Sequence, residues 1–299
     1  MEAVLTVIAP PGSAVLDRGV LEAARAAIRG LGAVVGSPRW LKPGEAADLP
    51  FEDIAPEAAE AAARGALGDL PLDLVAQAAA GRRKRLLVAD MDSTMVIGET
   101  LDELAALAGL KERIAAITAR AMAGELDFAQ ALRERVAMLA GLSETALAET
   151  HARLALMPGA ATVVATMRKH GAYAALVSGG FRYFTTRVAA TLGFDTEEGN
   201  TLEVADGALT GRVVEPILDR DAKLATLRRL AASRGLPLSA TLSVGDGAND
   251  IPMLLAAGLG VAFRAKPAVA AAARVRIDHG DLTALLWAQG YAEAEIVTA

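Results

Sequence analysis

The stretch Leu86-Leu87-Val88-Ala89-Asp90-Met91-Asp92-Ser93-Thr94 decides the fold of this chain. Its first four residues form a short apolar run, which predicts a buried β-strand. Two aspartates, separated by one residue, follow the run at once. Carboxylates at the end of a buried strand are costly unless they are paired, hydrogen-bonded or bound to a metal. Asp90 and Asp92 therefore mark a candidate site, and the groups that compensate their charge must lie elsewhere in the chain.

Strands and helices alternate after this stretch, which predicts an α/β fold with a parallel sheet and helices on both faces. Further strands are expected at residues 173–177, 241–244, 259–263 and 275–277, and helices at 160–170, 182–192 and 222–234. Between residues 98 and 156 only helical periodicity occurs, which predicts a helical cap inserted after the first strand. Asp206-Gly207 predicts a tight hairpin turn between strands at 201–205 and 208–214.

The chain is expected to contain three units. Residues 1–80 form a small α/β domain, with strands at 3–8 and 33–40, helices at 20–28 and 56–67, and a loop around Pro43, Gly44 and Pro50. A catalytic core comprises residues 82–98 and 157–299, and the cap comprises residues 99–156. The basic run Arg82-Arg83-Lys84-Arg85 marks the first boundary; we interpret it as a linker before a strand, with a nucleic-acid patch as the less favoured alternative.

Composition excludes several kinds of site. The 299 residues include no cysteine and three histidines, which lie far apart, so disulfides and thiolate or histidine metal sites are not expected. The net charge of −6 argues against a nucleic-acid partner. The charge-free stretch 251–263 is too short to span a bilayer, and no basic segment of a signal peptide opens the chain. We therefore expect a cytoplasmic protein without a membrane partner.

Three of the expected strands end in polar groups. They are followed by Asp90 and Asp92, by Ser178-Gly179-Gly180, and by the segment 245–250, Gly-Asp-Gly-Ala-Asn-Asp. Ligands of open α/β sheets bind outside the carboxyl ends of the strands, so these groups converge if the strands are neighbours. Carboxylate oxygens without sulfur ligands suit Mg²⁺. Lys223, which opens a helix, offers the fixed positive charge that a phosphoryl group requires.

These residue types predict phosphoryl transfer to a carboxylate. Asp90 would be the nucleophile, since a lysine and a metal can neutralise the phosphoryl oxygens that would otherwise repel it. Asp92 would protonate the leaving oxygen and then take a proton from water, with a pKa raised by its acidic neighbours. Asp246 would complete the metal site. The alternative of a dinucleotide fingerprint at Gly245-x-Gly247 fails, because Asp250 stands where a third glycine is needed.

Taken together, the motifs resemble those of the haloacid dehalogenase superfamily. They are Asp90 to Thr94, Ser178-Gly179-Gly180, Lys223, and the segment 245–250. Glu99, nine residues after the nucleophile, and the flanking residues Val177 and Phe181 make the set similar to the phosphoserine phosphatase branch over about residues 82–285. Residues 1–80 resemble, more weakly, the ACT-like domain found in many bacterial members.

The resemblance implies a substrate site shared between core and cap. Glu99 would bind an ammonium group and Arg135 a carboxylate, with the fork geometry that suits such groups. Phe128 lies two helical turns before Arg135 and so faces the same way; Met122 and Phe128 would exclude water. The remaining implied contacts to phosphate or substrate are Ser178, Gly179, Gly180, Lys223 and Asn249. The implied metal ligands are Asp90, the backbone carbonyl of Asp92, and Asp246, with Asp250 orienting them from behind.

The expected function is Mg²⁺-dependent hydrolysis of O-phospho-L-serine to L-serine and phosphate through an aspartyl-phosphate, the last step of serine biosynthesis. One alternative is a phosphatase or phosphotransferase of the same fold that acts on another small phosphate ester. Another is an amino-acid-sensing protein whose core has lost catalysis. The expected partner is the small-molecule substrate, with a homodimer left open.

Overall fold

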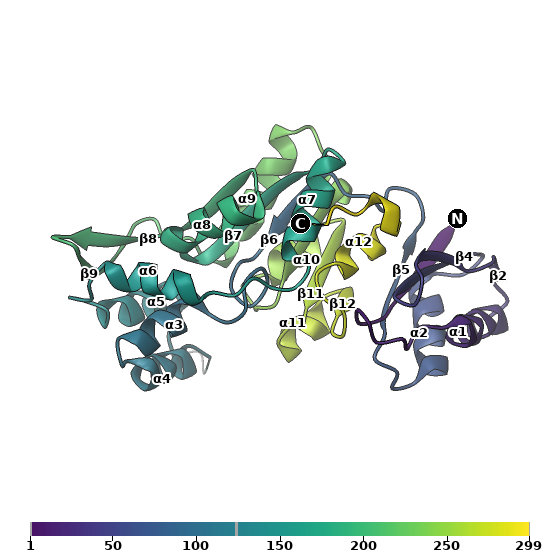
Figure 1. Ribbon diagram of the computed structural model, residues 1–299, viewed down its shortest axis with the longest axis horizontal. Helices are drawn as coiled ribbons and strands as arrows, with labels where there is room; N and C mark the ends of the chain where they lie inside the picture. Colours follow the sequence, from purple (N-terminus) through teal and green to yellow (C-terminus); the bar gives the residue numbers. More distant parts are fainter. Residues whose placement is uncertain (1, 123–124, 299) are drawn as a thin grey trace.

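The computed structural model describes residues 2–122 and 125–298, apart from the side chains at positions 119, 121, 122 and 220. Three units follow one another along its long axis (Figure 1). A small N-terminal sheet with two helices lies at one end, and a seven-stranded sheet lies in the middle. A group of four helices lies toward the other end. None of the helices in the described residues is long and apolar enough to cross a membrane.

The central sheet has the strand order β12-β11-β10-β6-β7-β8-β9. Its strands are β6 (Leu86–Ala89), β7 (Tyr173–Phe181), β8 (Thr196–Ala205), β9 (Ala208–Val214), β10 (Thr241–Gly245), β11 (Leu259–Phe263) and β12 (Val275–Ile277). All pairs are parallel except the β8–β9 hairpin. Because β6 pairs with both β10 and β7, the three strands that end in polar groups are neighbours. This is the arrangement that brings their polar groups together in one site.

Strand β6 is apolar along its whole length because both faces of the sheet are covered. Leu86 and Val88 pack against one layer of helices, and Leu87 and Ala89 belong to the core on the other face. The flanking helices are α7 (Ala160–Lys169), α8 (Arg182–Leu192), α9 (Arg220–Ser233), α10 (Ile251–Ala256), α11 (Pro267–Ala272) and α12 (Ala284–Ala288). The predicted α/β architecture is therefore confirmed.

Four helices form the cap between β6 and α7. They are α3 (Thr100–Leu107), α4 (Lys111–Met122), α5 (Phe128–Ala137) and α6 (Thr145–Arg153). The two linkers that join cap and core run side by side, since Ile97 donates a hydrogen bond of 2.9 Å to the carbonyl of Ala155. The β8–β9 hairpin also holds the cap: the amide of Gly141 donates to the carbonyl of Leu209 at 2.8 Å.

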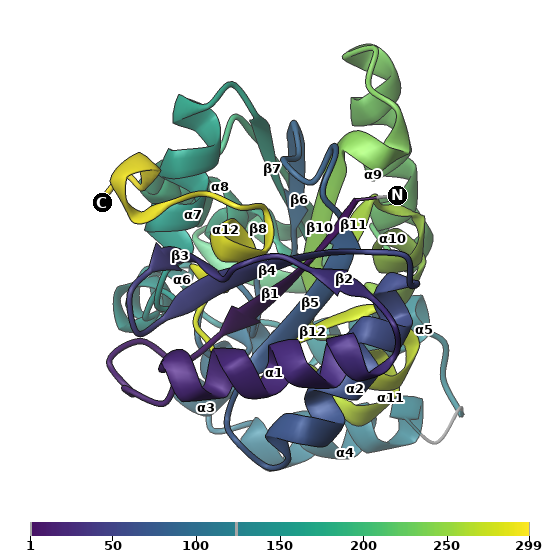
Figure 2. The same cartoon turned by 90° about the vertical axis from the view of Figure 1, so that its right-hand side faces the viewer.

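The N-terminal unit has the ferredoxin-like order of a split βαβ fold. Its elements are β1 (Ala3–Ile8), α1 (Arg18–Gly30), β2 (Val34–Val35), β3 (Arg39–Lys42), β4 (Ala46–Glu52), α2 (Pro56–Leu67) and β5 (Asp73–Ala78). The sheet is antiparallel, in the order β2-β4-β1-β5, with β3 beside β4. Figure 2 shows α1 and α2 on its outer face. Side chains of its inner face, such as Ile8 and Val75, share one hydrophobic core with the central unit.

Two sequence expectations for this unit are wrong. The single strand expected at 33–40 is split into β2 and β3, and the loop expected around Pro43, Gly44 and Pro50 contains strand β4. Strand β5 was not expected. The polar Asp48 breaks the apolar pattern of β4, and it is buried there because Thr6, Arg39 and Arg82 all bind its carboxylate. Two of these partners lie more than 30 residues away, so local spacing could not reveal them.

Candidate active site

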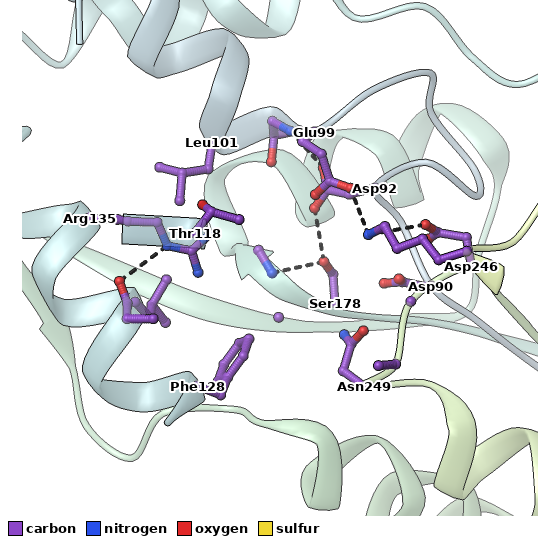
Figure 3. A pocket seen from close by; sticks show the side chains of 18 of the residues that line it. Asp90, Asp92, Glu99, Leu101, Thr118, Phe128, Arg135, Ser178, Asp246 and Asn249 are labelled. Atoms are coloured by element: carbon purple, nitrogen blue, oxygen red, sulfur yellow. Dashed lines mark hydrogen bonds and ion pairs between the residues drawn. The ribbon is translucent and has the colours of Figure 1, made fainter. Parts of the chain in front are cut away.

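The carboxyl ends of β6, β7 and β10 open into a cavity of about 710 Å³ between the core and the cap. Figure 3 shows the side chains that point into it. Core residues form one wall, and helices α3 and α5 and Thr118 of α4 form the other. Every candidate side chain named from the sequence lines this cavity or touches a residue that does, except Met122, whose side chain lies outside the described residues. The lining candidates are Asp90, Asp92, Glu99, Phe128, Arg135, Ser178, Gly179, Gly180, Asp246 and Asn249.

Lys223 supplies the missing counter-charge for the first aspartate. It projects from the first turn of α9 and is fully buried, with its Nζ 2.7 Å from both Asp90 Oδ1 and Asp250 Oδ1. The N-terminus of α9 is fixed by Asp219, whose side chain accepts hydrogen bonds from the backbone amides of Asp221 and Ala222. Although burial opposes it, the two carboxylates raise the pKa of Lys223, which therefore stays charged.

Asp90 lies in the most crowded part of the site. Its Oδ1 also accepts a 2.8 Å hydrogen bond from the amide of Met91, which fixes the carboxylate against its own backbone. Burial and the nearby Asp250 raise the pKa of Asp90, and Lys223 opposes them. The ammonium of Lys223 therefore stabilises the ionised form of Asp90, the form that a nucleophilic carboxylate requires.

Asp92 has different neighbours from Asp90. Its Oδ1 accepts a 2.8 Å hydrogen bond from the amide of Thr100, at the start of cap helix α3. Its Oδ2 accepts a weaker one of 3.3 Å from the hydroxyl of Ser178. Burial, reinforced by the Glu99 carboxylate, raises the pKa of Asp92 to about 6. A carboxyl group with that pKa can give and take a proton near neutral pH, which suits a general acid and base.

The glycines near the carboxyl end of β7 leave room for these contacts. A Cβ atom at Gly180 would lie 2.7 Å from Asp92 Oδ2, and one at Gly179 would lie 3.0 Å from the ring of Phe128. The segment is anchored from behind by Asn200, whose amide donates a 2.8 Å hydrogen bond to the carbonyl of Gly179. The small residues thus let the cap and Asp92 approach the chain at the place where a phosphate could meet backbone amides.

The donor set fits a magnesium ion. Asp90, Asp246 and Asp250 are buried and each offers a carboxylate oxygen, with these oxygens within 4.8 Å of one another. The buried ammonium near these three carboxylates is that of Lys223. Burial raises the pKa of Asp246 to about 6, although the positive charge of Lys266 opposes this shift. An oxygen-only acidic cluster of this kind suits Mg²⁺. Asp250 already binds Lys223 and, at 3.0 Å, the amide of Gly247, so its role fits orientation of the cluster.

Glu99 and Arg135 bring charge into the cap side of the cavity. Glu99 accepts a 3.0 Å hydrogen bond from Ser93, whose left-handed backbone (φ 55°) turns the chain from core to cap. Arg135 Nε donates to the carbonyl of Ala131 at 3.1 Å, which holds the guanidinium along α5. No carboxylate of the described residues lies within ion-pair distance of Arg135. Figure 3 shows its guanidinium directed into the cavity near Thr118 and Leu101.

Lys266 is a lining residue that sequence reasoning missed. Its Nζ lies 3.6 Å from Asp246 Oδ2 and 3.9 Å from Glu99 Oε1, so it links the acidic cluster to the cap. The side chain is half exposed, unlike that of Lys223. A signal was present in the sequence: Lys266 follows β11, a further strand whose carboxyl end meets the same edge of the sheet.

Comparison with known proteins agrees with this arrangement. The family model of haloacid dehalogenase-like hydrolases matches residues 87–255, and the chain belongs to that family. Within it, the chain is 50% identical over 220 residues to phosphoserine phosphatase SerB2 of Mycobacterium tuberculosis, covering 74% of this chain and 54% of that protein. It is 47% identical to the phosphoserine phosphatase of Streptococcus thermophilus, covering 67% of this chain and 93% of that one.

A solved structure resembles almost the whole chain. The probable phosphoserine phosphatase from Vibrio cholerae, in unliganded form, matches with a TM-score of 0.78 and 32% identity, covering 98% of this chain and 88% of that one. The match therefore includes the N-terminal unit. The chain spans just over half the length of the Mycobacterium relative. The resemblance to phosphoserine phosphatases that the motifs predicted is confirmed.

Proposed function

We propose that the protein is a Mg²⁺-dependent phosphatase that hydrolyses O-phospho-L-serine to L-serine and phosphate. One observation carries the proposal: a single cavity is lined by Asp90, which is paired with Lys223, and by Glu99 and Arg135. These three groups are complementary to the phosphate, the ammonium and the carboxylate of one small substrate. The names of the relatives support the same substrate.

The first half-reaction forms an aspartyl-phosphate. A carboxylate oxygen of Asp90 attacks phosphorus while the bond from phosphorus to the serine oxygen breaks. Asp92 gives its proton to that oxygen, so serine leaves as a neutral alcohol. Lys223 holds positive charge beside the phosphoryl oxygens, and the amides after Ser178 donate to them. A bound Mg²⁺ would add charge neutralisation at the same oxygens.

The second half-reaction restores the enzyme. Asp92, now ionised, takes a proton from a water molecule that attacks the phosphorus of the intermediate. The acyl-phosphate bond breaks, phosphate leaves and the carboxylate of Asp90 is regenerated. Phe128 and the cap helices exclude other water molecules while Asp90 attacks phosphorus.

A panel of phosphate esters tests the substrate. Phosphoserine should give the highest kcat/KM. The kcat/KM of phosphoethanolamine should be lower because it lacks the carboxylate, and that of phosphoglycolate should be lower because it lacks the ammonium group. If a neutral sugar phosphate gave the highest kcat/KM, the substrate would be another phosphate ester and not phosphoserine, while the type of reaction would stay the same. The absence of Mg²⁺-dependent turnover on every ester would favour the sensing protein instead.

Arg135→Ala is the sharper test. We expect kcat/KM for phosphoserine to fall by about 10- to 100-fold, the effect of a lost hydrogen bond between charged groups. Phosphoethanolamine should lose much less, since it carries no carboxylate. Equal losses on both substrates would remove Arg135 from the substrate site. The expected cytoplasmic location stays a prediction, and a homodimer and a sensing protein stay the open alternatives that they were.

A further inference from the structure

A second cavity lies at the opposite edge of the central sheet from the active site. It has a volume of about 660 Å³ and is lined by the residues before β6, β10, β11 and β12 and by the end of β5. It therefore lies where the N-terminal unit meets the core. The basic run Arg82–Arg85, which the proposed function leaves without a role, forms one of its walls.

The lining of this cavity is strongly basic. It contains Arg82, Arg83, Lys84, Arg85 and Arg274, and none of its described lining residues is an aspartate or glutamate. The whole chain has a net charge of −6, so the concentration of positive charge here is local. Such a concentration attracts anions to this place even though the protein as a whole repels them.

Two of the five cations are already neutralised. Arg82 makes two hydrogen bonds to the buried Asp48, at 3.0 and 2.5 Å. Arg83 binds Glu295 at 2.7 Å and lies over the ring of Tyr291. These arginines hold the N-terminal unit and the C-terminal segment against the core, so they are structural.

Lys84 has no such partner. It is only 7% exposed, and its Nζ donates hydrogen bonds of 2.9 Å to the carbonyls of Gly81 and Ser239. An ammonium has three donors, so one remains. No carboxylate of the described residues lies within ion-pair distance. Burial and the charge of Arg274 lower the pKa of Lys84. A buried cation without an anion is costly, which indicates that an anion is missing.

Arg85 and Arg274 complete a cationic face around Lys84. Arg85 is exposed, and no side-chain partner for it occurs among the described residues. Arg274 donates to the carbonyl of Ala76 at 3.2 Å and meets the exposed Glu57 at 3.4 Å, a weak contact at the rim. The facing wall is apolar and includes Leu254 and Leu255, of which Leu255 is 63% exposed.

We propose that this cavity binds a small organic anion, with a carboxylate or phosphate group on Lys84, Arg85 and Arg274 and an apolar part against Leu254 and Leu255. The uncompensated charge is centred on the buried Lys84 inside a cavity, which favours a small molecule over a nucleic acid. Because the cavity spans the N-terminal unit and the core, the bound anion would bridge them. The proposal does not depend on the enzyme's substrate.

Calorimetric titration of the full chain tests the site with benzoate and phenylphosphonate as probes, and with benzamide as their uncharged counterpart. Benzoate or phenylphosphonate should bind saturably, while benzamide should not. In Lys84→Met the Kd should rise about tenfold, as expected for a lost charged hydrogen bond. In Arg85→Gln, which is exposed and should fold normally, it should rise about threefold.

Two control variants separate this site from others. Arg212→Gln removes an exposed guanidinium from the β8–β9 hairpin and should leave the Kd unchanged. Arg135→Ala removes the cation of the active-site cavity and should also leave it unchanged. Binding that is lost in Arg135→Ala but kept in Lys84→Met and Arg85→Gln would assign the probes to the active site and overturn the proposal. Absence of saturable binding of both charged probes to the natural chain would overturn it as well.

Discussion

At the scale of single residues, two aspartates of identical chemistry have different surroundings. Asp90 is bound by the ammonium of Lys223, which favours its charged form. Asp92 is buried beside Glu99 and forms no ion pair among the described residues; burial and the Glu99 carboxylate raise its pKa to about 6, which favours its protonated form. Burial raises the pKa of both carboxyl groups, and the contact of Asp90 with Lys223 distinguishes the nucleophile that we propose from Asp92, the proposed general acid.

Asp90→Asn should abolish turnover and covalent labelling. The amide has nearly the same shape, so the fold is kept, but it cannot attack phosphorus. Mass spectrometry of acid-quenched enzyme should show a phosphoryl adduct for the natural chain and none for the variant. Asp92→Asn, a matched change two residues away, should slow turnover by about 10²–10⁴-fold because it loses general acid catalysis. Full activity of Asp90→Asn would refute the mechanism.

The pKa of about 6 for Asp92 predicts how the first half-reaction depends on pH. The protonated fraction of this carboxyl group falls as pH rises through 6, so the single-turnover rate on phosphoserine should fall above that pH. p-Nitrophenyl phosphate, whose leaving group needs no proton, should show a flatter profile. Identical profiles for the two substrates would mean that Asp92 is not the proton donor in this step.

At the scale of elements, one helix end positions the substrate side of the site. Helix α5 begins with a capping box in which Asp127 accepts from the amide of Gln130 and Gln130 reaches back to the amide of Asp127. Phe128 stands in its first turn and Arg135 stands two turns later. The capping box at the start of α5 therefore fixes where the ring of Phe128 and the guanidinium of Arg135 enter the cavity.

Asp127→Ala should therefore affect both stability and substrate binding. Loss of an N-cap lowers the free energy of unfolding by about 1 kcal/mol, and KM for phosphoserine should rise because Phe128 and Arg135 are less well held. Asp17→Ala removes the N-cap of α1 in the N-terminal unit and is the matched control. Denaturant unfolding should show similar losses for both variants, with KM changed only in the first. An unchanged KM in Asp127→Ala would contradict this role of the helix end.

At the scale of the whole molecule, the N-terminal unit is fastened to the core. Asp73, at the start of β5, is buried and its carboxylate accepts hydrogen bonds from the backbone amides of Asp278, His279 and Gly280. Inner-face side chains of the N-terminal unit, including Ile8 and Val75, also belong to the hydrophobic core of the central unit, although the unit has a core of its own. We expect the two units to unfold together in a single transition.

Asp73→Ala tests this attachment. The change leaves buried amides without an acceptor, so the free energy of unfolding should fall by about 3 kcal/mol. Asp69→Ala, an exposed aspartate of the same unit, should change it by less than about 0.5 kcal/mol. Chemical denaturation followed by both fluorescence and circular dichroism measures these values. Two separate transitions in the natural chain would show that the units are independent.

Much of the core and the site could be predicted because their signals are local. The strands at 259–263 and 275–277 occur where their apolar runs predict them, and the four cap helices follow their helical periodicity. The N-terminal sheet was predicted less well, because the polar residues of β4 are stabilised by partners distant in sequence. Lys266 was not predicted because it follows β11, and the only strand ends included in the candidate site were those of β6, β7 and β10.

By itself, the sequence determined which residues end the central strands, where the cap is inserted and which side chains can carry phosphoryl chemistry. Each of these depends on spacing over a few residues, which the chain displays directly. Only the tertiary structure decided how charge is balanced: Lys223 joins Asp90 to Asp250, Lys266 meets Asp246, and Lys84 is buried with no carboxylate of the described residues beside it. Coulomb interactions and desolvation depend on distance in space, and folding sets that distance.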